Sequence, residues 1–524
     1  LAGRKLKGVD ALHRLCDELG IGEADDSQMA LRLSEAVLED LRRPYEEPMH
    51  LTEKLAYAKR TGVWKNAGLL PGGAKDEIFN AILKTSTNLN SDPMDMLTQC
   101  LRLGISTGIY GLVLVNRLND ILMGEPELGF DPVGMRVIDP ECINIMVTGH
   151  QHSMFGSLTG MMEHPEIKEM ADRAGARGIR IVGCTCVGQD FQARSRCYEK
   201  VFCGHAGNNY SSEAVLLTGC IDLVVSEFNC SLPGIEPICE ELSIPMLCLD
   251  DVAKKKGARH LPYHPEDRED VSVNVIAAAI ASYVRRSRAG KRQNPMQDHG
   301  CNEAVTGVTE RTLKGALGGS FAPLIDLIAA GSIKGVAAVV GCSNLRAKGH
   351  DVFTVELVKK LIARDILVVS AGCTCGGLEN CGLMSRDAAG LAGPGLSQVC
   401  RSLGIPPVLN FGPCLAIGRI EAVAGELAGA LGVDLPKLPV VVSAPQWLEE
   451  QALADGAFAL ALGFHLHLGL APFVMGSPVI LDVLCNQMEG ITGGKLMVET
   501  EIDAAAEKIA AVISDKRRGL GLNE

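Results

Sequence analysis

The sequence has few aromatic residues and no excess of basic charge. Aromatic residues make up 4% of its 524 residues, and 50 lysines and arginines face 63 aspartates and glutamates, which gives a formal net charge of −13. A nucleic-acid-binding protein needs basic side chains to neutralise phosphates, and so does a protein that docks on an anionic membrane. The charge balance therefore argues against both kinds of partner.

Long hydrophobic runs, leader peptides and nucleotide-binding motifs are lacking as well. The longest apolar stretches, Val275–Val284 and Phe458–Phe464, are too short or too broken by His and Gly to span a bilayer. We find no signal peptide, no Walker loop, no Ser-His-Asp arrangement and no GxGxxG after a predicted strand. The sequence thus predicts no membrane span and a cytoplasmic protein. Because it begins at Leu1 and not at Met, we expect an N-terminal segment to be missing.

Glycine and cysteine are abundant, with 58 and 19 residues respectively. Disulfide frameworks are typical of short secreted chains, and this chain is long. In a reducing compartment, cysteines serve as buried core residues or as metal ligands. The position of each cysteine relative to the predicted strands therefore decides how it is interpreted.

The hydrophobic pattern predicts an α/β protein in three parts. Residues 1–140 have helical spacing, as in Leu31–Arg42, and form the first domain. Short apolar runs then alternate with helix-like stretches, which predicts two α/β domains with parallel sheets, at 141–290 and 291–524. The predicted strands are Ile143–Val147, Ile179–Val182, Ile221–Val225, Ile244–Leu249, Val336–Val340, Ile366–Val369, Pro407–Asn410 and Pro439–Ser443.

Six of these strands lead directly into a soft metal ligand, in most cases just after a glycine. The ligands are His150, Cys184 or Cys186, Cys230, Cys342, Cys373 and Cys414. Parallel strands present their carboxyl ends at one edge of a sheet, so the six side chains can converge between the two domains. Five thiolates and one imidazole exceed the four ligands of a zinc site and suit an iron–sulfur cluster with additional metal.

Spacing alone leaves several residues open. It does not choose between Cys184 and Cys186, and Cys375, two residues after Cys373, has no assigned role. His205, on a Gly-rich loop, is a further candidate near the site. His467 is either part of a polar strand face or a neighbour of the cluster. We expect the other cysteines to be core residues.

Six segments carry a resemblance to the nickel–iron carbon monoxide dehydrogenases, relatives of the hybrid-cluster (prismane) proteins. They are Ile143–His150, Ile181–Asp190, Leu217–Cys230, Gly315–Asn344, Asp365–Cys373 and Pro406–Cys414. The resemblance implies a helical domain followed by two Rossmann-like domains, with a nickel–iron–sulfur cluster between them. It implies the ligands His150, Cys186, Cys230, Cys342, Cys373 and Cys414, because Cys186–Gln189 aligns with the family's Cys-Thr-Gly-Asn.

The same resemblance implies the interconversion of CO and water with CO₂, two electrons and two protons. Its expected partners are CO or CO₂, a ferredoxin-like electron carrier and a second copy of the chain in a homodimer. Additional 4Fe–4S clusters are expected only in a segment upstream of Leu1. Two alternatives remain: a hybrid-cluster-like reductase of hydroxylamine or a similar molecule, and a non-catalytic metal-binding subunit.

Three positions depart from the family pattern. Gln451 stands where the family has an acid–base lysine, so we take it as the candidate catalytic position. Gly108 stands where an acidic residue is expected before Tyr110, and Asn410 where the family commonly has histidine. A glutamine donates hydrogen bonds but does not carry a proton, so these changes predict altered proton handling.

Overall fold

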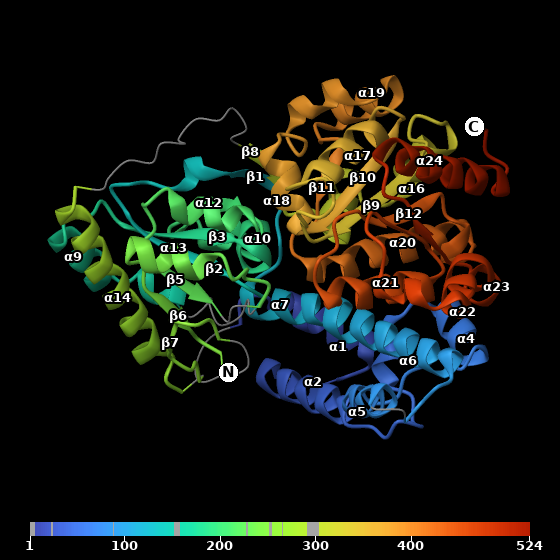
Figure 1. Ribbon diagram of the computed structural model, residues 1–524, viewed down its shortest axis with the longest axis horizontal. Coiled ribbons are helices and arrows are strands. Elements are labelled where there is room, and N and C mark those ends of the chain that lie inside the picture. The colour runs from blue at the N-terminus through green and yellow to red at the C-terminus, as the bar shows by residue number, and fades with distance from the viewer. Residues whose placement is uncertain are drawn as a thin grey trace.

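The computed structural model of the chain is an α/β protein with two six-stranded parallel sheets, as the sequence predicted. It describes residues 6–22, 25–86, 89–150, 158–226, 229–250, 254–264, 266–290 and 303–523. Figure 1 shows the first sheet with its helices in green, the second in yellow to red, and the N-terminal helices in blue beneath the second.

The first sheet has the strand order β4–β3–β2–β5–β6–β7, and all its neighbouring strands are parallel. Its strands are β2 (Ile143–Thr148), β3 (Ile179–Cys184), β4 (Phe202–Gly207), β5 (Leu223–Ser226), β6 (Met246–Cys248) and β7 (Arg259–His260). Counted along the chain, this is the order 3-2-1-4-5-6 of a Rossmann fold, which reverses direction between β2 and β5.

The second sheet repeats this topology with the order β11–β10–β9–β12–β13–β14, again parallel. Its strands are β9 (Gly335–Gly341), β10 (Ile366–Gly372), β11 (Val408–Asn410), β12 (Val440–Ala444), β13 (His465–Leu468) and β14 (Lys495–Val498). The order reverses between β9 and β12. In such sheets, ligands bind beyond the carboxyl ends of the strands at the point of reversal.

Helices cover both sheets. A short antiparallel pair joins β1 (Gly129–Pro132), which precedes the first sheet in sequence, to β8 (Glu303–Thr306), which precedes the second. The N-terminal helices are α1 (Val9–Leu19), α2 (Asp26–Leu41), α3 (His50–Leu55), α4 (Ala58–Asn66), α5 (Ala74–Thr85), α6 (Pro93–Ser106), the π-helix η1 (Thr107–Leu114) and α7 (Val115–Met123). Those around the first sheet are η2 (Met135–Val137), α9 (Pro165–Arg173), α10 (Thr185–Ala193), α11 (Ser195–Tyr198), α12 (Ser211–Leu217), α13 (Ile235–Leu242) and α14 (Arg268–Arg288).

The second sheet is surrounded by a larger set of helices. They are α15 (Glu310–Ala316), α16 (Ala322–Ala329), α17 (Val352–Ile362), α18 (Cys373–Asn380), η3 (Arg386–Leu391), α19 (Pro394–Leu403), η4 (Cys414–Ala416), α20 (Ile417–Leu431), η5 (Leu435–Lys437), α21 (Glu450–Leu462), η6 (Phe473–Gly476), α22 (Pro478–Asp482), η7 (Val483–Gln487), α23 (Met488–Ile491) and α24 (Ile502–Gly519).

The apolar core explains why these strands are continuous hydrophobic runs. Ile143, Ile145 and Val147 of β2 pack on one face of the first sheet, and Met146 packs on the other. A sheet covered on both faces needs apolar side chains at every position. The N-terminal helices share a single core with the second sheet, so they pack against that unit. The domain limits at 140 and 290 remain an interpretation of the sequence.

All eight predicted strands are present, but the sequence analysis missed others. Phe202–Gly207, which includes the loop proposed around His205, is strand β4. Its pairing with β3 contains register shifts, and Gly204 has φ +131°, so glycine here marks an irregular strand and not a loop. β7 and β14 were missed because they are short and carry polar residues.

The prediction of no membrane-length segment has one exception. Residues Pro93–Met123 form 31 residues of continuous helix with a mean hydropathy of 1.2 over their most apolar window, enough in length and composition to cross a bilayer. Of that window, 61% is buried inside the protein, as expected of a core helix.

Candidate metal centre

The six residue positions predicted to bind metal all follow the carboxyl end of a strand. His150 comes two residues after β2, Cys186 is the second residue of α10 after β3, and Cys230 lies four residues after β5. In the second unit, Cys342 and Cys373 directly follow β9 and β10, and Cys414 lies four residues after β11. Both sheets therefore direct their ligand-bearing loops toward the region where the two units meet.

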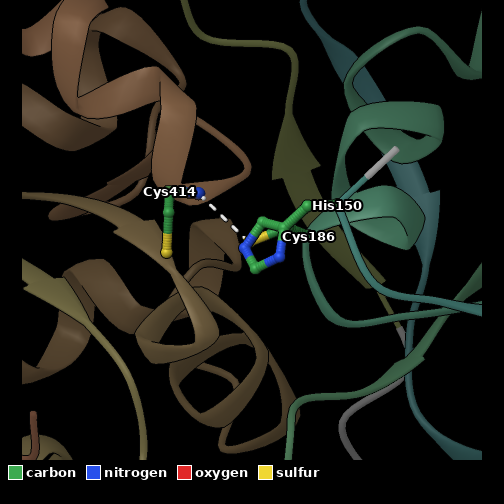
Figure 2. A group of neighbouring side chains, drawn as sticks. All are labelled: His150, Cys186 and Cys414. Atoms are coloured by element: carbon green, nitrogen blue, oxygen red, sulfur yellow. Dashed lines mark hydrogen bonds between the residues drawn. The ribbon is translucent and has the colours of Figure 1, made fainter. Parts of the chain in front are cut away.

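Three of these residues meet at one point. The ligand atoms of His150, Cys186 and Cys414 all lie within 4.8 Å of one another (Figure 2). The backbone N–H of Cys414 donates a hydrogen bond to Cys186 Sγ at 3.3 Å. His150 and Cys186 come from the first unit and Cys414 from the second, so the group bridges the two units.

The other three cysteines lie around this group. Cys230 Sγ is 4.0 Å from His150 Nε2. Burial raises the pKa of the Cys373 thiol, and the nearby charges of Cys414, Cys342 and Cys230 raise it further. Burial, and then the charge of Cys414, also raises the pKa of Cys342, to about 12. Mutual electrostatic influence of this kind requires that the thiols are near neighbours.

Cys186 and Cys414 are close enough to change each other's pKa. Their hydrogen bond raises the pKa of Cys186 and lowers that of Cys414 well below its ordinary value, and His150 lowers the pKa of Cys414 further. Two adjacent buried thiols cannot both ionise without a cation to compensate their charge. The donor set therefore fits metal ions, which displace the protons and neutralise the thiolates.

Helix starts and backbone N–H groups orient the sulfurs. Cys373 is the first residue of α18, and its sulfur accepts the N–H of Asn209 from the first unit. Cys342 Sγ accepts the N–H groups of Leu448 and Glu449, just before α21 begins. These N–H groups lower the pKa of the two thiols and so oppose the larger effect of burial, which raises it.

Gly372 allows the loops to approach each other closely. Its φ of +89° is a left-handed conformation, and a Cβ there would lie 2.6 Å from Cys414 Sγ and 2.7 Å from the Gly341 carbonyl oxygen. Any side chain would thus displace a candidate ligand. Gln189 of α10 holds the backbone of Gly372 in place, because its Nε2 donates a hydrogen bond to the Gly372 carbonyl at 2.6 Å.

The loop that carries His150 is tied to the loop that carries Cys186. Thr185 adopts φ +54°, and its Oγ1 accepts the N–H of Gly149 at 2.8 Å. A non-glycine residue in this region is uncommon, and such residues often occur at functional sites. The backbone of Cys230 is also in the left-handed region, with a φ of +55°.

Cys184 lies outside the group. Its sulfur lies near Ser212 and the backbone of Gly207, and the residue packs in the core with Cys203. The geometry thus favours Cys186, and the inclusion of Cys184 among the ligands lacks support. Cys375 is turned into the core of the second unit near Ser370.

The sequence profile of the Prismane/CO dehydrogenase family matches residues 2–503. The chain belongs to this family. A carbon monoxide dehydrogenase of Methanocaldococcus jannaschii is 44% identical over 519 residues, which are 99% of this chain and 82% of that protein. One from Methanopyrus kandleri is 42% identical, over 99% of this chain and 84% of its own length.

Solved structures of the Prismane/CO dehydrogenase family agree with the fold. A nickel-free carbon monoxide dehydrogenase from Thermococcus sp. AM4 is 32% identical, with a TM-score of 0.93 over 99% of this chain and 81% of that one. Carbon monoxide dehydrogenase IV of Carboxydothermus hydrogenoformans is 31% identical, with a TM-score of 0.92 over 99% and 82%. The family supports an oxidoreductase with an iron–sulfur metal centre.

The departures from the family pattern have structural counterparts. Gln451 is exposed in the first turn of α21, and its Nε2 donates to Asp455 Oδ1 at 3.0 Å. A Cβ on Gly108 would collide with the ring of Phe458, so an acidic side chain at 108 is incompatible with this packing. Asn410 Nδ2 donates to Glu379 Oε2 at 3.2 Å.

Sequence reasoning left the two histidines open and missed two acidic residues. His467 contacts Ser443 and the Glu499 carbonyl, which makes it part of the strand scaffold. His205 is fully buried and pairs with Glu379. Asp455 and Glu379 gave no signal, because each is isolated in the sequence from the predicted ligands. The only signal in the sequence was their spacing: Asp455 lies four residues after Gln451, and Glu379 lies four residues after Cys375.

Proposed function

We propose that this chain is the catalytic core of a carbon monoxide dehydrogenase. It interconverts CO and water with CO₂, two protons and two electrons. The observation that carries the proposal is the meeting of His150, Cys186 and Cys414 between two parallel sheets. That arrangement occurs in a chain that aligns over 99% of its length with carbon monoxide dehydrogenases.

The ligand set that we assign to a nickel–iron–sulfur cluster is His150, Cys186, Cys230, Cys342, Cys373 and Cys414. Five thiols and an imidazole are more than one tetrahedral zinc can bind, and soft thiolates suit iron and nickel in sulfide clusters. When bound, such a cluster would supply a soft metal for CO, a Lewis acid that lowers the pKa of water, and a store for two electrons.

The chain's own residues hold and orient this group. The N–H groups of Leu448, Glu449 and Asn209 direct two of the sulfurs, and Gly372 keeps the space beside Cys414 open. Gln451 offers an amide N–H at the start of α21. An amide hydrogen-bonds to a carboxylate-like group but does not accept its proton.

The hybrid-cluster alternative is not favoured. The relatives at 30–44% identity are carbon monoxide dehydrogenases, and so are the solved structures above. A non-catalytic metal-binding subunit would share the fold and the ligands, so only an activity measurement separates it from the enzyme.

The remaining assignments follow from this function. Electrons would leave to a ferredoxin-like carrier, and additional 4Fe–4S clusters would connect the centre with that carrier if an upstream segment provides their ligands. By analogy with the family, we also propose that the protein is a homodimer, and we propose that it is cytoplasmic.

The first test is metal analysis of anaerobically purified protein, followed by CO-dependent reduction of a viologen dye. We expect about one nickel and several irons per chain, and dye reduction that requires CO. Iron without nickel after nickel is supplied to reduced protein would favour the hybrid-cluster alternative. A full cluster without any turnover would favour the non-catalytic subunit.

Replacing Cys230 tests the ligand assignment directly. Cys230→Ala should abolish cluster assembly, because five ligands cannot hold the same set of metals. Cys485→Ala is the matched control, since Cys485 is also half-buried but lies on η7, which carries none of the assigned ligands. A full metal complement in Cys230→Ala would remove Cys230 from the ligand set.

A further inference from the structure

Asp455 is a buried carboxyl one helical turn behind Gln451, the position of the family's acid–base lysine. It lies in the second turn of α21, is 8% exposed, and accepts a hydrogen bond from Gln451 Nε2 at 3.0 Å. The same helix begins beside Cys342, whose sulfur accepts the N–H groups of Leu448 and Glu449. Gln451 thus fixes the carboxyl of Asp455 close to the end of α21 that adjoins the ligands.

The charges around Asp455 tie it to the centre. Burial, and then the negative charge of Cys414, raises its pKa to about 8, while Gln451 and His150 oppose this shift. Cys414 of the second unit and His150 of the first unit therefore both shift the pKa of the Asp455 carboxyl. A group whose pKa lies near the working pH suits proton transfer in both directions.

A second carboxyl lies farther along the same space. Asp455 and Glu421 both line a cavity of about 50 Å³ next to Gly341, the residue before Cys342. Burial raises the pKa of Glu421 to about 7, and Arg117 opposes this shift. The rest of the lining is apolar, so a water in this cavity would depend on the two carboxyls for its hydrogen bonds.

The other elements packed on α21 bring no charge to this cavity. β12 and β13 contribute apolar side chains such as Val440 and Leu466. α6 and η1 meet α21 through Gly104 and Gly108, which lie against Ala457 and Phe458. Among the lining residues, the two carboxyls are thus the groups that can hold a proton.

We propose that Asp455 is the proton acceptor of the site, held in place by Gln451, with Glu421 as the next carboxyl along the cavity. The inference rests on the proposed function. In the oxidation CO + H₂O → CO₂ + 2 H⁺ + 2 e⁻, the O–H bonds of water break. One proton at a time goes to a carboxylate oxygen of Asp455 and then leaves by way of Glu421 or solvent. The two electrons pass to the acceptor of the dehydrogenase reaction.

Asp455→Asn tests this role in the metal-loaded enzyme. We expect kcat for CO oxidation to fall by about 10²-fold or more, as is typical when general acid–base help is lost, with iron and nickel content unchanged. The rise of kcat with pH that reflects deprotonation of Asp455 should disappear. Asp455→Glu should restore part of the rate and the pH dependence, which a purely structural role would not require.

The matched control is Asp482→Asn. Asp482 also pairs with an amide four residues away, because Asn486 Nδ2 donates to its Oδ1 at 2.8 Å, but this pair is exposed on α22. Asp482→Asn should leave both kcat and its pH profile unchanged. Retention of the full rate and pH profile in Asp455→Asn would overturn the proposal.

Infrared difference spectroscopy gives a readout that does not depend on turnover. Near pH 7 we expect a carboxylic acid C=O band that shifts in D₂O, that is lost in Asp455→Asn and that persists in Glu421→Gln. A band left in Asp455→Asn that a further Glu421→Gln removes belongs to Glu421, whereas a spectrum unchanged by Asp455→Asn would overturn the proposal even if the rate falls. Absence of CO oxidation in the loaded wild-type protein would instead refute the proposed function, and the infrared result would still decide whether Asp455 holds the proton.

Discussion

Gln451 is the residue at which this chain departs most directly from the chemistry of its family. Its side chain is exposed at the start of α21 and donates to Asp455, so it positions a carboxyl and carries no proton itself. The same position filled by a lysine would place an ammonium group within reach of that carboxyl. The effect of a single side chain on proton handling can therefore be measured in an unchanged scaffold.

Gln451→Lys should raise the rate of CO oxidation, by about tenfold or more, because an ammonium carries a proton and forms charge-assisted hydrogen bonds with carboxylates. The measurement is kcat of nickel-loaded protein, with Gln451→Met as a control of similar length without an amide or charge. Asp455→Asn should cost less when it is combined with Gln451→Lys, since a second proton carrier is then present. An unchanged rate in protein shown to contain nickel would contradict this account of position 451.

At the scale of elements, a buried polar network joins three segments that carry assigned ligands. His205 Nδ1 of β4 lies 2.5 Å from Glu379 Oε1 of α18, and both side chains are fully buried. Glu379 Oε2 accepts hydrogen bonds from Gln192 of α10 at 3.1 Å and from Asn410 of β11 at 3.2 Å. Since α10, α18 and β11 lead to or contain Cys186, Cys373 and Cys414, this network connects the segments that carry these three ligands.

Glu379→Gln should therefore lower both stability and metal content. Leaving buried hydrogen-bonding groups without a suitable partner costs about 1–3 kcal/mol, which a shift of the urea midpoint would report. Glu426→Gln is the control, because Glu426 pairs with Lys314 in an exposed ion pair that contributes at most about 1 kcal/mol. Equal stability and equal iron content in the two variants would contradict a joining role for Glu379.

The elements that the sequence predicted well are those whose pattern is set by burial alone. β2, β9 and β10 are covered on both faces, so they are apolar almost throughout, and the ligand positions followed from their ends. β4 was missed because its glycines and polar residues suit an irregular edge strand. Cys184 and Cys186 could not be separated by spacing, since the strand turns into a helix between them and changes which side chain faces the centre.

Asp455 and Glu379 were beyond sequence reasoning for a different reason. Glu379 faces the first unit and Asp455 faces a cavity lined by α20, β12 and β13, and such tertiary contacts leave no local periodicity. The close packing of Gly108 against Phe458 is of the same kind, because the two residues are 350 positions apart in the chain and meet where η1 packs on α21.

At the scale of the molecule, the chain consists of two packed bodies with the candidate metal centre between them. The N-terminal helices and the second sheet share one core, as in the hydrogen bond from Trp64 Nε1 to the Ala461 carbonyl at 2.7 Å. The first sheet has separate cores on its two faces. Three assigned ligands come from each body, so a bound cluster would link the two bodies with bonds stronger than any side-chain contact between them.

Removal of the metal should therefore loosen both bodies at their junction and leave their outer helices unaffected. Hydrogen exchange in metal-loaded and metal-free protein should differ in the loops after β2, β3, β9 and β10, because local opening there no longer has to break metal–ligand bonds. α14 and α24, which carry no assigned ligand, serve as internal controls and should exchange equally in both forms. Protection lost from only one of the two bodies would mean that the cluster is bound by that body alone, and would contradict a centre shared between the two sheets.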